Sequence, residues 1–322
     1  MDNATHILGI DIAKLKFDIA LIINGKVKDK TFKNTNDGFQ ELSRWLKQQH
    51  VNQIHACMEA TGIYWEALAA YLADRGHIVS VVNPAQIAAY GKSVLQRGKT
   101  DIQDARLIAR FCERERPETW QPAPIEQRQL LQWVRQLQHL NECHQAESNR
   151  LGTCADVVRP SIQAALAFFE MQIKEVSKQI DAHIDNNPDL KHNRELLDTI
   201  PGVGAKTAPW LLAYFGDGTR FGRGKQAAAF AGLSPCQYQS GSSVNGQSRI
   251  SKKGHTDLRR ILFMPALATY GRKKAFVPFV ERLQTAGKRP KEIIVALMRK
   301  IITIAQAVLK SQTAFNPILH AA

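Results

Sequence analysis

Two short apolar runs, each ending in an acidic residue, most constrain how this chain can fold. The first is His6–Asp11 (HILGID) and the second is Gln53–Glu59 (QIHACME). Runs of this length and composition are typical of buried strands. Residues 16–23 and 26–33 predict two more strands, and Asn24-Gly25 between them is the signal for a tight hairpin turn. The chain therefore begins with a sheet that carries carboxylates at the ends of two strands.

The segments that follow alternate between helices and strands. Asn36 or Asp37 can cap a helix that runs to about Gln49. Further helices are expected over 64–75 and after Pro84, with a strand over 78–82. The order β-β-β-α-β-α-β-α predicts an RNase H-like domain over 1–122. In such a sheet, the strands that end in the two acids are neighbours.

The chain changes character after residue 122. Seam residues spaced alternately three and four apart over 130–151 and 162–180 predict a helical coiled-coil hairpin over 123–190, bent near Pro160. The hairpin either pairs subunits or forms an ordinary helix pair within one chain. Residues 191–322 carry 21 Lys and Arg against 6 Asp and Glu, which predicts a mostly helical domain with a polyanionic partner. The expected fold class is α/β followed by all-α segments.

Composition excludes several classes of protein. The five cysteines are scattered without a C-x-x-C pair, which argues against a disulfide framework or a zinc site. The first residues lack the basic and apolar regions of a signal peptide, and no stretch of 18 uncharged apolar residues occurs. We therefore expect a cytoplasmic protein with no membrane segment.

A third and a fourth acid complete a candidate metal site. Asp101 and Asp104 lie three residues apart in KTDIQDARLIARF, so a helix brings both carboxylates to one face. With Asp11 and Glu59, they make four carboxylates that an RNase H-like fold could bring together in one site. Hard oxygen ligands suit Mg²⁺, and a pair of such ions can stabilise the attacking and leaving oxygens of a phosphoryl transfer. Each acid alone is more simply structural, and Asp101 could be only a charge at a helix N-terminus.

Two segments of the basic region are suited to nucleic acid. Pro201-Gly202-Val203-Gly204 resembles a helix-hairpin-helix turn, in which glycines let backbone amides approach a phosphate, and Lys206 follows it. A plain connection between helices is the alternative. The second segment is a Gly/Ser-rich loop over 240–260, which would grip phosphates through its basic residues. These are Lys252, Lys253, Arg259 and Arg260. No nucleophile can be deduced from the loop alone, because no activating base is visible beyond His255.

Several motifs together resemble a known family, the insertion-sequence transposases with an Asp-Glu-Asp-Asp tetrad. These are bridge-RNA-guided recombinases related to pilin-gene DNA invertases. The resemblance covers essentially the whole chain and shows no departure at the tetrad. The motifs are GIDIAK, MEATGIYW, VNPAQ, KTDIQDARLIA, IPGVGAKTA, FAGLSP and SG…NG…ISKKGHTDLRRIL.

The resemblance implies more than the residues do. It implies a domain like the Holliday-junction nuclease RuvC, a coiled-coil segment, and a transposase domain over 191–322 whose catalytic serine falls on Ser240, with Ser242 and Ser243 as less favoured alternatives. Attack by this serine would leave a 5′-phosphoserine and a free 3′-hydroxyl on the way to a Holliday junction. One subunit's tetrad would work with another's serine.

The implied partners are donor and target double-stranded DNA and a structured noncoding bridge RNA, whose loops pair with both DNAs. The resemblance also implies a tetramer associated with the bacterial nucleoid. Two other functions stay open. A RuvC-like junction-resolving endonuclease would use the same four acids with activated water, and a packaging protein would use its acids only to cap elements.

Overall fold

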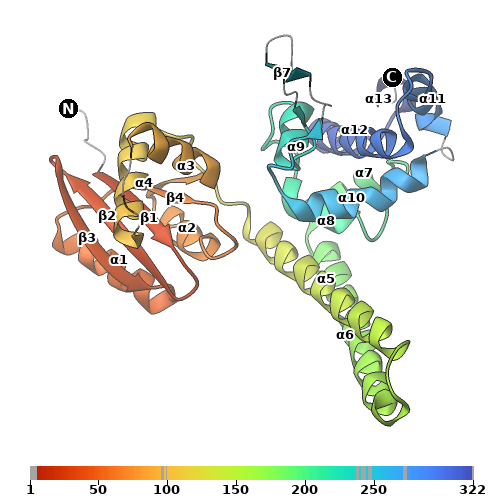
Figure 1. Cartoon of the computed structure of the whole chain (residues 1–322), viewed down its shortest axis with the longest axis horizontal. Coiled ribbons are helices and arrows are strands. Elements are labelled where there is room, and N and C mark those ends of the chain that lie inside the picture. The colour runs from red at the N-terminus through yellow and green to blue at the C-terminus, as the bar shows by residue number, and fades with distance from the viewer. Residues whose placement is uncertain are drawn as a thin grey trace. The chain divides into compact units, whose positions relative to one another are not determined.

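The chain forms two compact units, residues 1–122 and 123–322, each with its own hydrophobic core (Figure 1). The computed structural model describes residues 6–95, 98, 100–236, 239–240, 244–245, 249–270 and 274–320. The predicted segments 123–190 and 191–322 both lie within the second unit.

The first unit is built on a five-stranded sheet in the order β3-β2-β1-β4-β5. The strands are β1 His6–Ile12, β2 Lys16–Ile23, β3 Lys26–Lys33, β4 Ile54–Glu59 and β5 Ile78–Val82. β1, β2 and β3 form an antiparallel meander, while β4 pairs parallel with both β1 and β5. Asn24 and Gly25 both have positive φ, as the predicted hairpin turn requires. The ends of β1 and β4, with their acids, are therefore neighbours at one edge of the sheet.

Helices cover both faces of this sheet (Figure 1). They are α1 Asn36–Gln48, α2 Glu66–Ala73, α3 Pro84–Ser93 and α4 Asp101–Glu115. On one face, Phe39 and Leu42 of α1 and Leu68 of α2 pack in the main core of the unit. On the other face, Ala105 and Ala109 of α4 pack against the central strands.

Two details of the predicted helices are wrong. The cap of α1 is Thr35 rather than Asn36 or Asp37, because Thr35 has extended backbone and its side chain accepts a hydrogen bond from the Gly38 amide at 3.3 Å. The helix expected over 64–75 begins only at Glu66, since Tyr64 and Trp65 belong to the loop that follows β4.

The second unit begins with two long helices, α5 Ile125–Leu151 and α6 Arg159–Asp185, which pack against each other along their length. A short 3₁₀ turn, Asp156–Val158, leads into α6, and Pro160 stands in the first turn of that helix. The fixed φ and missing amide of proline are tolerated there. The reversal of chain direction thus falls just before Pro160.

The rest of the second unit packs around α12 (Pro290–Ser311), whose apolar residues are buried nearly all round. Every residue of α8 (Ala208–Phe215) is also buried. The other elements are α7 Pro188–Asp198, α9 Gly224–Phe230, β6 Pro235–Cys236, β7 Gln239–Ser240, β8 Val244–Asn245, β9 Arg249–Ile250, α10 Thr256–Thr269, the 3₁₀ turn Lys274–Phe276, α11 Val277–Thr285 and α13 Pro317–His320. Within the described residues, no helix has both the length and the apolar character to cross a membrane.

The contact between β1 and α4 predicts a strong effect of substitution at Gly9. A Cβ on Gly9 would lie 2.2 Å from the Ala105 carbonyl oxygen and 2.3 Å from the Ala109 nitrogen, and neither backbone atom can move aside alone. Gly9→Ala should therefore lower the free energy of unfolding by about 3 kcal/mol, near the upper end for overpacking. Urea unfolding followed by circular dichroism measures this.

Gly152→Ala is the matched control, because its Cβ would meet nothing closer than the Asn149 carbonyl oxygen at 3.6 Å. It should change the free energy of unfolding by less than about 0.5 kcal/mol. Equal effects of the two substitutions would contradict the close approach of α4 to the sheet.

Candidate active site

The alternation of side chains along β1 decides where Asp11 points. Residues two apart in a strand share a face, so Ile7, Gly9 and Asp11 lie on the same side of the sheet. That side is the one covered by α4, because Ile7 packs with Ala105 and Ala109. Asp11 therefore lies on the α4 side of the sheet, just past the contact between Gly9 and α4 and near the N-terminal end of that helix.

The first turn of α4 brings two further acids to the same place. The Thr100 hydroxyl oxygen accepts a hydrogen bond from the Gln103 amide at 3.2 Å, which fixes the start of the helix. Asp101 and Asp104 both lie in this turn, and Asp101 stands one turn before Ala105. The packing of Ala105 on β1 thus places both acids near Asp11.

The fourth acid, Glu59, is the last residue of β4. Cys57, two residues earlier, packs in the small core beneath α4, so Glu59 lies on the α4 side of the sheet as well. The Thr61 hydroxyl donates to Glu59 Oε1 at 2.5 Å, and the Thr61 amide donates to the Glu59 carbonyl at 2.9 Å. The loop after β4 therefore holds this carboxylate in place.

The structure adds two residues that the sequence analysis missed, Lys16 and Asp18 of β2. Asp18 is directly opposite Asp11 in the antiparallel register and is buried. Lys16 Nζ lies 3.1 Å from Asp18 Oδ2 and 2.8 Å from Asp101 Oδ2, and both carboxylates raise its pKa. The predicted hairpin joined residues 16–23 to 26–33, so the pairing of Asp18 with Asp11 is known only from the register of β2 on β1.

Electrostatic repulsion shows that the acids are close enough to affect one another. Burial and, after it, the charges of Asp104, Asp101, Glu59 and Asp18 together raise the pKa of Asp11 from 3.8 to about 6. A carboxyl with such a pKa can exchange a proton near neutral pH, and the surrounding charge favours a cation. As they stand, no three His, Cys, Asp or Glu side chains among the described residues are arranged to hold a metal ion.

The Gly/Ser-rich loop of the second unit contains a two-part hairpin. β6 pairs with β9, and β7, which contains Ser240, pairs with β8. Ser242 and Ser243 lie outside the described residues. Ser240 thus has a defined backbone position in the second unit, whereas the four acids belong to the first.

The predicted phosphate-binding residues fall into two groups. Arg259 donates to the carbonyls of Ala231 at 3.0 Å and Gly254 at 3.1 Å, and Arg260 forms ion pairs with Glu142 and Asp257, so both hold the fold together. The second group consists of three exposed lysines and the two glycines of the Pro201–Gly204 turn.

Lys206, Lys252 and Lys253 are exposed to solvent. Gly204 has open space where a Cβ would be, whereas a Cβ on Gly202 would lie 2.7 Å from Thr269 Cγ2. Gly202 also has a φ of +90°, so packing and conformation alone explain a glycine there. The role of these residues in binding nucleic acid stays a prediction.

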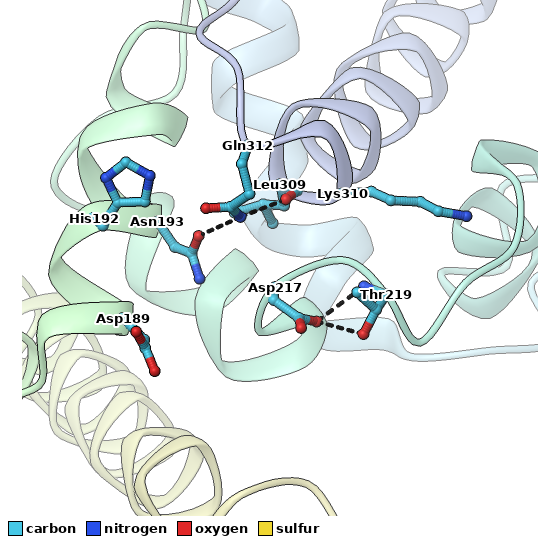
Figure 2. A pocket seen from close by; sticks show the side chains of 8 residues that line it. All are labelled: Asp189, His192, Asn193, Asp217, Thr219, Leu309, Lys310 and Gln312. Carbon is cyan, nitrogen blue, oxygen red and sulfur yellow. Dashed lines mark hydrogen bonds between the residues drawn. The ribbon is translucent and has the colours of Figure 1, made fainter.

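A polar pocket of about 310 Å³ lies elsewhere in the second unit, between α7, the loop after α8 and the end of α12 (Figure 2). Much of its lining is internally paired. Asn193 Oδ1 accepts from Gln312 Nε2 at 2.9 Å, and Asp217 Oδ1 accepts from the Thr219 amide at 2.9 Å. It is lined by Asp189, His192, Asn193, Asp217, Thr219, Leu309, Lys310 and Gln312. None of these was predicted as a site residue, and the two aspartates make the pocket unsuited to phosphate.

Comparison with known proteins gives matches over most of the chain. A transposase profile matches residues 8–160, and the profile of the transposase IS116/IS110/IS902 family matches residues 194–280. The pilin gene-inverting protein of Moraxella bovis is 40% identical over 316 residues, which cover 97% of this chain and 98% of that protein. The chain belongs to the IS110 transposase family.

A second relative matches over about half of this chain. An uncharacterized 43.6 kDa protein of insertion element IS110 from Streptomyces coelicolor is 31% identical over 161 residues, which cover 50% of this chain and 38% of that protein. In this chain, the two matched regions contain the four acids and Ser240, respectively. Membership of the family places the activity of the chain in DNA recombination.

The raised pKa of Asp11 predicts how stability depends on pH. Because the folded pKa of about 6 exceeds the ordinary value of 3.8, the folded state holds its proton at higher pH than the unfolded state does. Stability should therefore fall as pH rises from about 4 to above 6 without metal. Asp11→Asn should remove this fall and be more stable than the wild type at pH 8.

Urea unfolding at several pH values in the presence of a chelator measures this. Glu41→Gln, which changes an exposed acid of α1, is the control and should keep the wild-type pH dependence. A pH dependence that is the same in Asp11→Asn and the wild type would show that the acids do not interact as described.

Proposed function

We propose that this chain is an insertion-sequence recombinase that cuts and rejoins DNA strands with its four acids and a serine nucleophile. The observation that carries the proposal is the position of Glu59, Asp101 and Asp104 near Asp11, whose pKa is raised by burial and by these charges. Clusters of acids with perturbed pKa values are typical of catalytic sites. The RNase H-like, or RuvC-like, assignment of the first unit is part of this proposal and is supported by its strand order.

The four acids would hold Mg²⁺, and the chemistry of the donor set fits this ion. They provide hard oxygen atoms, which Mg²⁺ prefers, and their repulsion would be relieved by a divalent charge. When bound, Mg²⁺ would stabilise the negative charge that develops on the phosphate oxygens. Lys16 Nζ lies 2.8 Å from Asp101 Oδ2, so Mg²⁺ would compete with this lysine for that oxygen.

Ser240 would be the nucleophile, as the family resemblance implies. Its Oγ would form a bond to phosphorus and lose its proton, while the bond from phosphorus to the 3′ oxygen breaks and that oxygen gains a proton. The products are a 5′-phosphoserine and a 3′-hydroxyl, so a later attack by another 3′-hydroxyl can rejoin strands without an energy source. A serine hydroxyl needs activation, which requires the acids or another base nearby.

The acids and the serine would work together across chains in a tetramer on donor and target DNA. A structured noncoding RNA would choose both DNAs by base pairing. The charge of residues 191–322, with 21 Lys and Arg against 6 Asp and Glu, supports phosphate contacts that are independent of base sequence.

The covalent intermediate gives a direct test. Wild-type protein with guide RNA, DNA and Mg²⁺ should form a covalent protein–DNA adduct, seen as a shifted band on a denaturing gel. Ser240→Ala and Asp11→Ala should each reduce the adduct at least a hundredfold, because they remove a nucleophile and a metal ligand. Mixing the two variants should restore activity if the site is shared between chains.

Other outcomes would revise the proposal. An adduct lost in Ser242→Ala or Ser243→Ala but kept in Ser240→Ala would move the nucleophile along the loop. Nicked DNA without any adduct from active wild-type protein would favour a junction-resolving nuclease that activates water.

Dependence on RNA is a separate prediction. Protein treated with RNase should still bind DNA non-specifically, with an affinity that falls steeply as salt rises, because its lysines and arginines contact phosphates. It should lose sequence-specific strand exchange, which sequencing of the recombined junctions measures. Full specific exchange by RNA-free protein would contradict the role of a guide.

A further inference from the structure

Arg220, in the loop between α8 and α9, is a cation that has no acidic partner in the part of the chain that the structure describes. Its guanidinium carbon lies 4.8 Å from the ring centroid of Phe230 and 5.6 Å from that of Phe221. Among the described residues, its side chain forms no hydrogen bond or ion pair. Residue 220 as a whole is exposed to solvent, although the burial of its guanidinium is enough to lower the pKa of that group. Its hydrogen-bond donors are therefore available to a ligand.

Several other arginines of the second unit are paired with acids of the same chain. Arg194 pairs with Asp181 at 2.8 Å, and Arg260 pairs with Glu142 and Asp257. Arg282 of α11 also stacks on an aromatic ring, with its guanidinium carbon 5.3 Å from the ring centroid of Phe279. Both of these residues belong to α11, and neither is in the loop of Arg220. Stacking on a ring orients a guanidinium and leaves its edge, with the N–H donors, free for a planar or bidentate acceptor.

The surroundings of Arg220 are positively charged. His255 also packs on Phe230, with ring centroids 4.2 Å apart. Burial and, after it, the charges of Arg220, Arg135 and Arg259 lower the pKa of His255 to about 4. The charge of Asp257 acts in the opposite direction. The imidazole is therefore neutral at pH 7, and an anion beside Arg220 would reduce an unfavourable concentration of positive charge.

Phe230 links this region to the hairpin that contains Ser240. The Phe230 carbonyl accepts a hydrogen bond from the His255 amide at 3.0 Å. Just beyond, the Ser251 amide donates to the Ser234 carbonyl at 2.8 Å, which joins the two segments that lead out to β7. Arg220 thus lies at the base of the hairpin, in the same unit as Ser240.

We propose that Arg220, oriented by Phe221 and Phe230, binds a backbone phosphate of the DNA strand at the base of the Ser240 hairpin. A guanidinium and a phosphate form charge-assisted, often bidentate hydrogen bonds, and no acid in the described part of the chain pairs with this guanidinium. Such a contact would fix the register of the strand without reading its sequence. The inference rests on the proposed function in one respect, because it takes DNA as the ligand.

Binding of a short DNA duplex to the full chain, in a chelator and without strand cleavage, tests the inference. Arg220→Gln should weaken binding about tenfold and reduce the slope of log affinity against log salt by about one, since one phosphate contact is lost. The affinity of Arg220→Lys should lie between those of the wild type and Arg220→Gln, because the charge remains while the bidentate geometry is lost. Arg282→Gln removes a similarly stacked arginine elsewhere and should change neither quantity.

His255 provides a second measurement on the same samples. Its pKa, followed by NMR of labelled histidine and assigned with His255→Gln, should rise when the duplex binds, because a phosphate offsets the arginines that lower it. This rise on binding should disappear in Arg220→Gln and persist in Arg282→Gln.

Three results would overturn the inference. Unchanged affinity and an unchanged rise of the His255 pKa in Arg220→Gln would make Arg220 a packing residue. Equal losses in Arg220→Gln and Arg282→Gln would show only a general effect of charge. A contact that appears with an RNA duplex and not with DNA would assign the phosphate to RNA. Because no assay here needs Ser240 or the acids, failure of the proposed chemistry would leave these results interpretable.

Discussion

The close approach of α4 to β1 is the contact on which the candidate site depends. It requires a glycine at position 9 and small residues, Ala105 and Ala109, on the facing helix. Because Asp11 follows Gly9 by two residues on the same face, and Asp101 precedes Ala105 by one helical turn, the same contact sets the separation of the acids. A bulkier residue at Gly9 would push α4, with Asp101 and Asp104, away from β1 and Asp11. The geometry of the site therefore depends on this packing contact.

This constraint carries an electrostatic cost. Asp11 lies near four other carboxylates, and Lys16 pairs with two of them, Asp18 and Asp101. Residues that repel one another lower the stability of the fold unless a cation is present. The basic excess of the chain is placed far along the sequence, in residues 191–322. In our proposal, that separation lets one unit draw phosphate in while the other holds the metal.

The sequence predicted local features well and non-local ones poorly. The strands over 16–23, 26–33 and 78–82 have the expected bounds, because alternation and the Asn-Gly turn are encoded within a few residues. The position of Asp11 and Glu59 on neighbouring strands followed from the expected order of elements. The cap at Thr35 was missed because its neighbours Asn36 and Asp37 are equally good caps. Lys16 and Arg220 were missed because their roles depend on residues distant in sequence.

Arg220 and Gly202 show why motif and charge alone are weak guides to a binding surface. Gly202 belongs to a turn that resembles a DNA-binding motif, yet its positive φ and its contact with Thr269 already explain a glycine there. Arg259 and Arg260 add to the basic charge, but their donors are occupied by carbonyls and carboxylates of the same chain. Arg220 belongs to no recognised motif and has donors that nothing in the described chain satisfies. Because the ring contacts orient this guanidinium and leave its donors free, Arg220 indicates a ligand more strongly than the charge count does.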